Sequence, residues 1–138
     1  DAFASLLDNL RGSNNYSDQC WLGFEEKNFE AVIDLQMVKD IRKVGIGCLQ
    51  NQNAWIFFPG TLKILVSDDG QEFKPAGHLR IGDTIPDDEV KTGEFSVLLD
   101  ATRARYIQIV AENTGRCPDW HKGAGGKAWL FVDEIVVE

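Results

Sequence analysis

Hydrophobic and polar residues alternate along most of the chain, and a period of two predicts β-strands. Between residues 61 and 67, for example, Leu62, Ile64 and Val66 fall on one face. Segments rich in glycine, proline and asparagine separate the alternating runs, as expected for turns. The predicted strands are Phe29–Leu35, Ile41–Leu49, Thr61–Ser67, Phe73–Leu79, Phe95–Leu99, Tyr106–Glu112 and Phe131–Val137.

The last predicted strand has a clear two-faced pattern. One face is expected to carry Phe131, Asp133, Ile135 and Val137, and the other Val132, Glu134 and Val136. The pair Asp69-Gly70 follows a strand and tolerates a positive φ, so it predicts a hairpin turn. The polar segment Arg80–Thr92 is expected to be a surface loop.

Helical spacing occurs only at the start of the chain, over Asp1–Arg11, where Phe3, Leu6, Leu7 and Leu10 recur at helical intervals. Parallel strands need crossover connections, and no helices separate these strands. The pattern therefore predicts a single domain, residues 1–138, that is an antiparallel β-sandwich or jelly roll with one short N-terminal helix.

Composition and charge narrow the range of partners. The chain has 138 residues, of which 43% are hydrophobic, which suits one domain with a real core. No apolar run approaches the length needed to span a membrane. The net charge is −8, which argues against nucleic acid and anionic membranes and favours a neutral ligand or a cation.

The three cysteines, Cys20, Cys48 and Cys117, show no zinc-binding spacing. Cys48 falls in a predicted strand and is interpreted as a small buried apolar residue. Cys20 and Cys117 lie in predicted loops, where they either pair or stay reduced, and the low cysteine count favours three reduced thiols.

A family resemblance rests on four segments: LLDNLRGSNNYSDQCWLGF, FEAVIDLQMVKDIRKVGIGCLQN, LKILVSDDGQEF and ARYIQIVAEN…WLFVDEIVV. In this order they resemble the discoidin domain, also called the coagulation factor 5/8 type C domain, a jelly roll of the galactose-binding-like class. QNQNAWIFFP and WHKGAGGKAWLFVDEI are most similar to the C-terminal modules of bacterial chitobiase-type β-hexosaminidases. The resemblance implies sugar binding by loops at one end of the sandwich and a structural calcium near the chain termini.

In such a fold, the loops Gly12–Phe24, Gln50–Pro59 and Asn113–Trp129 are expected to gather at one end. Sugars bind flat aromatic faces through their C–H groups, and amides or charged groups through their hydroxyls. The candidate ligand-binding residues are Tyr16, Gln50, Asn51, Trp55, Asn113, Trp120 and His121. Trp120 is the best candidate for an exposed aromatic face. Trp21 and Trp129 adjoin strands and are expected to be structural, and His121 is either a hydroxyl donor or a solvated loop residue.

The resemblance also implies a calcium site made by Asp8, Ser13 and Glu134, whose hard oxygen donors suit Ca²⁺. Asn9 stands where the family usually has glycine, and asparagine also tolerates a left-handed backbone. The alternative is that Asp8 caps a turn and that Glu134 pairs with a lysine.

Catalysis has weak support in the sequence. Asp133 and Glu134 are adjacent in a predicted strand and should point to opposite faces, so they cannot flank one glycosidic bond. The run of Asp87, Asp88 and Glu89 is most simply a solvated surface.

The sequence thus predicts a non-catalytic carbohydrate-binding module for a neutral sugar such as N-acetylglucosamine or galactose. Calcium is its expected structural cofactor, and the catalytic domain of a parent chitobiase-type glycosidase is its expected partner. Such a module would be secreted, periplasmic or at a bacterial cell surface. The alternatives are a part of a glycosidase active site and a protein-adhesion or docking module.

Overall fold

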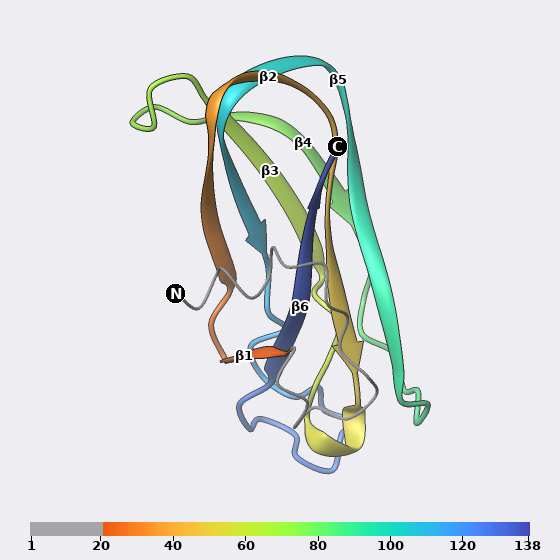
Figure 1. Cartoon of the computed structure of the whole chain (residues 1–138). Coiled ribbons are helices and arrows are strands. Elements are labelled where there is room, and N and C mark those ends of the chain that lie inside the picture. The colour runs from red at the N-terminus through yellow and green to blue at the C-terminus, as the bar shows by residue number, and fades with distance from the viewer. Residues whose placement is uncertain (1–20) are drawn as a thin grey trace.

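The computed structural model describes residues 21–138, which form six strands and one short 3-10 helix (Figure 1). The elements are β1 (Leu22–Glu25), β2 (Phe29–Gln50), η2 (Gln52–Ala54), β3 (Thr61–Ser67), β4 (Lys74–Arg80), β5 (Lys91–Ala111) and β6 (Trp129–Val137). The helix expected over Asp1–Arg11 lies outside the described residues. Within residues 21–138, no helix is long and apolar enough to cross a membrane.

The two longest strands, β2 and β5, form an antiparallel ribbon that runs the length of the molecule. The sheet order is β1-β6-β2-β5-β3-β4, with every pair antiparallel. Phe29–Asp34 of β2 pairs with Tyr106–Ala111 of β5, and Lys43–Gln50 pairs with Lys91–Leu98. β6 joins the second half of β2, whereas β3 joins the second half of β5.

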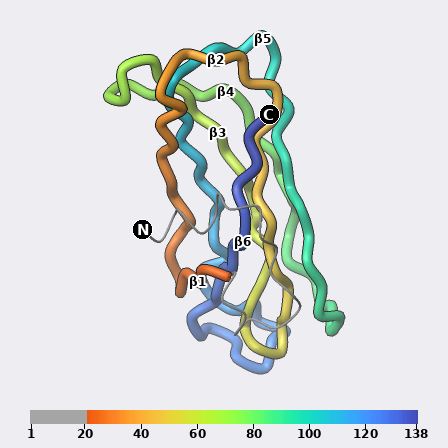
Figure 2. Tube along the Cα trace, viewed as in Figure 1, coloured from red at the N-terminus to blue at the C-terminus, as the bar shows by residue number. Residues whose placement is uncertain are grey.

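The ribbon bends sharply in its middle, where both strands curve over together (Figures 1 and 2). The pairing of β2 with β5 shifts between Asp34 and Lys39 and again between Ile41 and Lys43. Gln36 and Ala101, at φ values of 76° and 45°, lie in this region. Extra residues of this kind kink a strand, so the bend follows from the irregular pairing.

Because the ribbon bends, the two ends of one sheet face each other as two layers. The buried side chains of both layers meet in a single core. Val44 and Leu130 come from one layer, and Ile64 and Ile107 from the other, and all four are fully buried. The protein is therefore an antiparallel β-sandwich, as the alternating pattern predicts.

The structure corrects several strand boundaries. Phe29–Leu35 and Ile41–Leu49 belong to one strand, and Phe95–Leu99 and Tyr106–Glu112 belong to another, except that Glu112 lies just beyond it. The sequence pattern breaks at the bulged bend, where alternation is lost but pairing resumes. β1 lies in a segment expected to be a loop. The hairpin at Asp69-Gly70 is confirmed, with Gly70 at a φ of 76°.

The expected division of the last strand into two faces holds for only part of its length. Ile135 and Val132, which were expected on opposite faces, are both buried in the core, together with Leu130 from the first part of β6. The register to β2 shifts between Glu134 and Val132, which leaves Asp133 as an extra residue. A bulge moves the two-residue period by one, so the inward positions change there.

We expect the core between the layers to supply most of the stability. Leu130→Ala, at a side chain that is 0% exposed, should lower the free energy of unfolding by about 2–5 kcal/mol, because it leaves a cavity. Leu98→Ala is the matched control, since Leu98 is 79% exposed and should change it by less than about 0.5 kcal/mol. Urea denaturation measures both variants, and equal effects would contradict this assignment of the core.

Candidate functional site

Three connecting segments gather at the end of the sandwich opposite the bend (Figures 1 and 2), which we call the loop end. They are residues 51–60, 81–90 and 112–128. The expected proximity of the first and third is confirmed by hydrogen bonds between them. The second segment, residues 81–90, is joined to them by the side chains of Gln50, at the end of β2, and of Gln52.

The first segment is a tight turn around η2. The side-chain oxygen of Asn51 accepts a hydrogen bond from the backbone N–H of Ala54 at 3.3 Å, so Asn51 caps the helix. Trp55 ends it with a left-handed backbone, at a φ of 66°. Backbone bonds of Trp55 and Phe57 to Trp129 then fix the turn against the start of β6.

Glycines of the third segment let the chain approach the indole of Trp55 closely. A Cβ atom at Gly123 would lie 2.5 Å from the Trp55 ring, and one at Gly126 would lie 2.9 Å from it. Only a residue without a side chain fits at these distances. Trp55, expected as a sugar ligand, therefore packs largely against residues 123–126 and is 36% exposed.

His121 is buried and joins the first and third segments. Its Nδ1 accepts a hydrogen bond from the backbone N–H of Gly123 at 2.9 Å. Nε2 therefore carries the ring proton and donates it to the carbonyl oxygen of Gln52 at 2.5 Å. The rings of Trp55, Phe57 and Trp120 meet the imidazole edge-on. Neither ring nitrogen is free to bind a hydroxyl, so His121 supports the loops instead.

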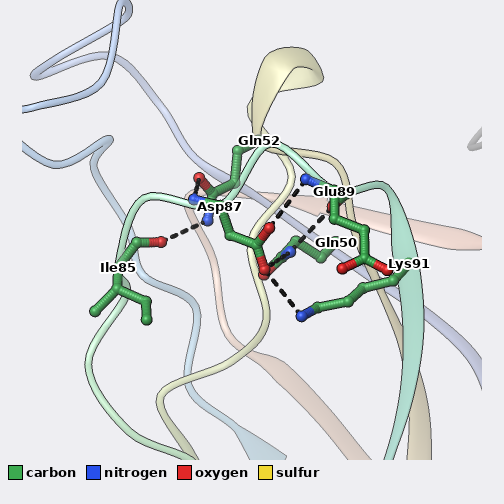
Figure 3. Close-up of polar contacts among 6 residues, drawn as sticks. All are labelled: Gln50, Gln52, Ile85, Asp87, Glu89 and Lys91. Atoms are coloured by element: carbon green, nitrogen blue, oxygen red, sulfur yellow. Dashed lines mark hydrogen bonds and ion pairs between the residues drawn. The ribbon is translucent and has the colours of Figure 1, made fainter.

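Two buried glutamines hold the segment 81–90 (Figure 3). The Gln50 side chain donates to Asp87 Oδ2 and to the carbonyl oxygen of Glu89, both at 3.1 Å. The Gln52 side chain donates to the carbonyl oxygen of Ile85 at 2.9 Å and accepts from the N–H of Asp87 at 3.0 Å. Both N–H groups of the Gln50 side chain, which was expected to bind a ligand, are thus used inside the protein.

Asp87 is the ionic centre of this network. Lys91 Nζ lies 2.9 Å from Asp87 Oδ2, and the N–H of Glu89 donates to Oδ1 at 3.0 Å. The bond from Lys91, then that from Glu89, and then that from Gln50 lower the pKa of Asp87 to about 2. The interpretation of residues 87–89 as a simple solvated run is therefore wrong at Asp87.

Asn113 lies at the start of the third segment and is also occupied. Its side-chain nitrogen donates to the carbonyl oxygens of Phe24 and Lys27, both at 2.9 Å. Its oxygen accepts from the N–H of Gly115 at 2.8 Å. Asn113 therefore ties the segment to β1 and to the turn after it, and both N–H groups of its amide are used within the protein.

A cleft of about 520 Å³ opens between the second and third segments. Trp120, 43% exposed, forms part of one wall. The side chains of Asn53, Asp88 and Lys122 are exposed at the cleft and available to a ligand. The lining residues are Gln52, Asn53, Pro86, Asp87, Asp88, Trp120, His121 and Lys122.

The cleft brings together only part of the predicted set. Trp120 is exposed as expected, and the imidazole of His121 packs edge-on against its indole. Tyr16, Asp8 and Ser13 lie outside the described residues. The sequence reasoning missed Gln52, Asn53, Asp88 and Lys122, although the amide-rich run QNQN and the acidic run at 87–89 were visible signals.

A second hollow, of about 320 Å³, lies beside the β3–β4 hairpin and is lined by Ser67, Asp69 and Arg103, among others. Here Asp69 accepts bonds from Ser67, Gln71 and Glu72, which build the turn itself. This hollow has no exposed tryptophan, so the cleft at Trp120 is the better candidate for ligand binding.

Asp133 and Glu134 are buried in the bulge of β6, with 2% and 4% of their surfaces exposed. Such burial keeps both carboxylates away from a substrate in the cleft. Hard, buried carboxylate oxygens of this kind fit a calcium ligand at Glu134. Within residues 21–138, no three His, Cys, Asp or Glu side chains group to hold a metal, and the other two expected ligands, Asp8 and Ser13, lie outside this range.

The cysteine and tryptophan assignments can be checked directly. Cys48 is fully buried in the core, as predicted, and burial raises the pKa of its thiol. Cys117 is a free thiol packed with Phe57 and Ala128. Trp21 packs on Leu49 and Ile56, and Trp129 packs against Phe131, so both tryptophans are structural as expected.

Solved structures with the same architecture are sandwiches that serve as sugar-binding modules. CBM32-3 from a family 31 glycoside hydrolase of Clostridium perfringens has a TM-score of 0.53 and 16% identity, over 82% of this chain and 67% of that one. GH31 CBM32-2, solved bound to GalNAc, has a TM-score of 0.56 and 12% identity, over 97% of this chain and 85% of that one. At these identities the likeness shows the fold alone.

A chitobiase C-terminal domain from Bacteroides fragilis is similar at a TM-score of 0.50 and 19% identity. The alignment covers 81% of this chain and 63% of that domain. The model of the F5/8 type C domain matches residues 4–133, so the chain belongs to this family. None of the curated proteins matches the chain.

The contact of Trp55 with Gly123 can be tested by adding one methyl group. Gly123→Ala should destabilise the protein by about 1–3 kcal/mol and shift the Trp55 indole resonance, because the loop must move. Gly60→Ala is the matched control, since a Cβ atom there would meet nothing within 4 Å. Thermal unfolding and NMR measure both, and an unshifted Trp55 resonance in Gly123→Ala would contradict the packing described.

Proposed function

We propose that this domain is a non-catalytic carbohydrate-binding module that takes a neutral sugar in the cleft beside Trp120. The exposed indole of Trp120, next to polar side chains in a cleft of about 520 Å³, is the observation that carries the proposal. The sugar-binding modules among the solved structures of the same fold support it.

The available groups suit the two kinds of surface on a sugar. The face of Trp120 can stack on the apolar C–H surface of a pyranose ring. Asn53 offers both a donor and an acceptor, Lys122 offers donors, and Asp88 offers acceptors. A sugar hydroxyl can therefore find a partner whether it donates or accepts a hydrogen bond. N-acetylglucosamine and galactose are the sugars we would test first.

The charge at the cleft favours uncharged sugars over acidic ones. Asp88 has no cation paired with it among the described residues, whereas Asp87 is paired with Lys91. The net charge of the whole chain is −8, which repels carboxylated or sulfated glycans.

We further propose that the domain is appended to a glycoside hydrolase of the chitobiase type, in a secreted, periplasmic or cell-surface bacterial protein. An open cleft should bind weakly, with a Kd on the order of 0.1–1 mM. Such affinity is useful when the module is tethered to a catalytic domain, because tethering raises the local substrate concentration.

Trp120→Ala should abolish detectable sugar binding without unfolding the domain, because the side chain lies outside the core. Trp120→Phe keeps an aromatic face and should retain part of the affinity. Titration of N-acetylglucosamine and galactose, followed by NMR shifts and tryptophan fluorescence, measures the effect. Leu98→Ala, another exposed apolar truncation, is the control and should bind as the parent does.

Two results would count against the proposed site. One is that Trp120→Ala binds as well as the parent. The other is that ligand-induced shifts map away from residues 53, 88 and 120–122. Turnover of a chromogenic glycoside by the isolated domain would instead indicate an enzyme.

We also propose that Glu134, with Asp8 and Ser13, holds a structural calcium ion. The carboxylate of Glu134, which is buried in the bulge of β6, and the side chains of Asp8 and Ser13 offer the hard oxygen ligands that calcium prefers. Bound calcium would stabilise β6 where it carries its bulge, a few residues after the end of the third segment.

Removing calcium should lower the melting temperature, because a ligand that binds only the folded state stabilises it. The effect is about 2.7 kcal/mol when free calcium is 100 times its Kd. Asp8→Ala should lower the melting temperature similarly and remove the response to chelator. Asp68→Ala, at an exposed acidic position of the hairpin, is the control and should keep the response to chelator. Identical melting curves with and without verified metal removal would exclude the site.

A further inference from the structure

Gln52 contacts both walls of the cleft from its floor. It is only 7% exposed, and it is the first residue of η2. One wall belongs to residues 81–90 and the other to residues 112–128. We propose that Gln52 is the positioning residue that sets how the two walls face each other, and therefore the affinity of the cleft. This inference rests on the proposed function, since it concerns the same cleft.

Three hydrogen bonds carry the proposal. The Gln52 side chain donates to the carbonyl oxygen of Ile85 and accepts from the N–H of Asp87, at 2.9 and 3.0 Å (Figure 3). Its own carbonyl oxygen accepts from His121 Nε2 at 2.5 Å. The side chain thus fixes the wall that bears Asp88, and the main chain fixes the wall that bears Trp120.

The chemistry of this position requires a neutral amide. Ile85 presents an acceptor and Asp87 presents a donor, so the residue between them must offer one donor and one acceptor. This requirement also assigns the two ends of the Gln52 amide: the nitrogen faces Ile85 and the oxygen faces Asp87. Gln50 differs, because its nitrogen faces two acceptors, Asp87 Oδ2 and the carbonyl oxygen of Glu89.

The ends of the segment 81–90 are held by other contacts: Ile81 and Val90 pack against the hydrophobic clusters, and Ile81 and Gly82 donate to the carbonyl oxygen of Gly60. Its middle contains no helix or strand, and Ile85 is 69% exposed, so residues 85–89 bury little apolar surface. The conformation of residues 85–89 then depends mainly on polar contacts from Gln50, Gln52 and Lys91. The core lies elsewhere, so losing the contacts of Gln52 should loosen the cleft while the sandwich stays folded.

The variant Gln52→Glu allows the proposal to be tested by its pH dependence. An ionised carboxylate has only acceptors and repels the carbonyl oxygen of Ile85. A protonated carboxyl has one donor and one acceptor and restores both bonds. The ordinary pKa of a glutamate is about 4.3, and burial raises it, so recovery is expected near pH 4.5.

The parent network should persist over the same range. The pKa of Asp87 is lowered to about 2, so its contribution to stability is present above its ordinary pKa of 3.8 and is lost only as the pH falls toward 2. Between pH 4.5 and 7.5 Asp87 therefore stays ionised. Any pH effect on other groups is removed by dividing each variant's Kd by that of the parent at the same pH.

The experiment compares the parent, Gln52→Glu and Gln52→Ala as full-length chains. The probe is N-acetylglucosamine or galactose, whichever binds the parent. At pH 7.5 we expect Gln52→Glu to bind about tenfold more weakly, as an unsatisfied buried polar group implies, and the Kd ratio to approach one at pH 4.5. Gln52→Ala lacks both bonds and should bind weakly at both pH values. Gln108→Glu, which adds the same charge on β5 away from the cleft, should stay near the parent.

A second measurement needs no sugar. Amide hydrogen exchange at Asp87 should speed up in Gln52→Ala, and the amide shifts of residues 84–89 in Gln52→Glu should return toward parent values at pH 4.5. If no sugar binds the parent but these changes appear, the proposed function fails and the positioning role stands. A Gln52→Glu affinity ratio that is the same at both pH values, or unchanged Asp87 exchange in Gln52→Ala, would overturn it.

Discussion

The pairing of β2 with β5 is the constraint on which the rest of the structure depends. These strands pair on both sides of an irregular bend, so one ribbon belongs to both layers of the sandwich. β6 and β3 then add to different halves of the ribbon, and their buried faces meet in the core. The bend at one end leaves the connecting segments at the other. The position of the candidate site is thus a consequence of how the ribbon folds.

At the loop end, hydrogen bonds of buried polar side chains add to apolar packing in holding the connecting segments. Gln50, Gln52, Asn113 and His121 use their side chains to satisfy main-chain groups of segments without regular structure. A buried donor or acceptor without a partner costs free energy, so these contacts hold the loops in place. The rigid frame leaves Trp120 exposed on one wall of a cleft whose other wall is acidic.

This arrangement explains why residue type alone does not separate ligand-binding side chains from structural ones. An amide or imidazole in a loop suits a sugar hydroxyl and a main-chain group equally well. Asn113 and His121 have their polar atoms occupied by the protein, whereas Asn53 and Lys122 present theirs to the cleft. Whether a polar side chain serves a ligand or the fold depends on what lies within about 3 Å, which a sequence does not specify.

The sequence by itself determined the antiparallel β-sandwich, the hairpin at Asp69-Gly70, the buried Cys48 and the exposed Trp120, because alternation, turn residues and local composition act over short distances. It also carried the family to which the chain belongs. Only the tertiary structure decided that β2 and β5 are continuous, that β6 shifts its register at Asp133, and that residues 81–90 form a wall of the cleft. Each of these depends on pairing between residues distant in sequence. Gln52 contacts Asp87, which is 35 positions away, and no local pattern reveals such a bond.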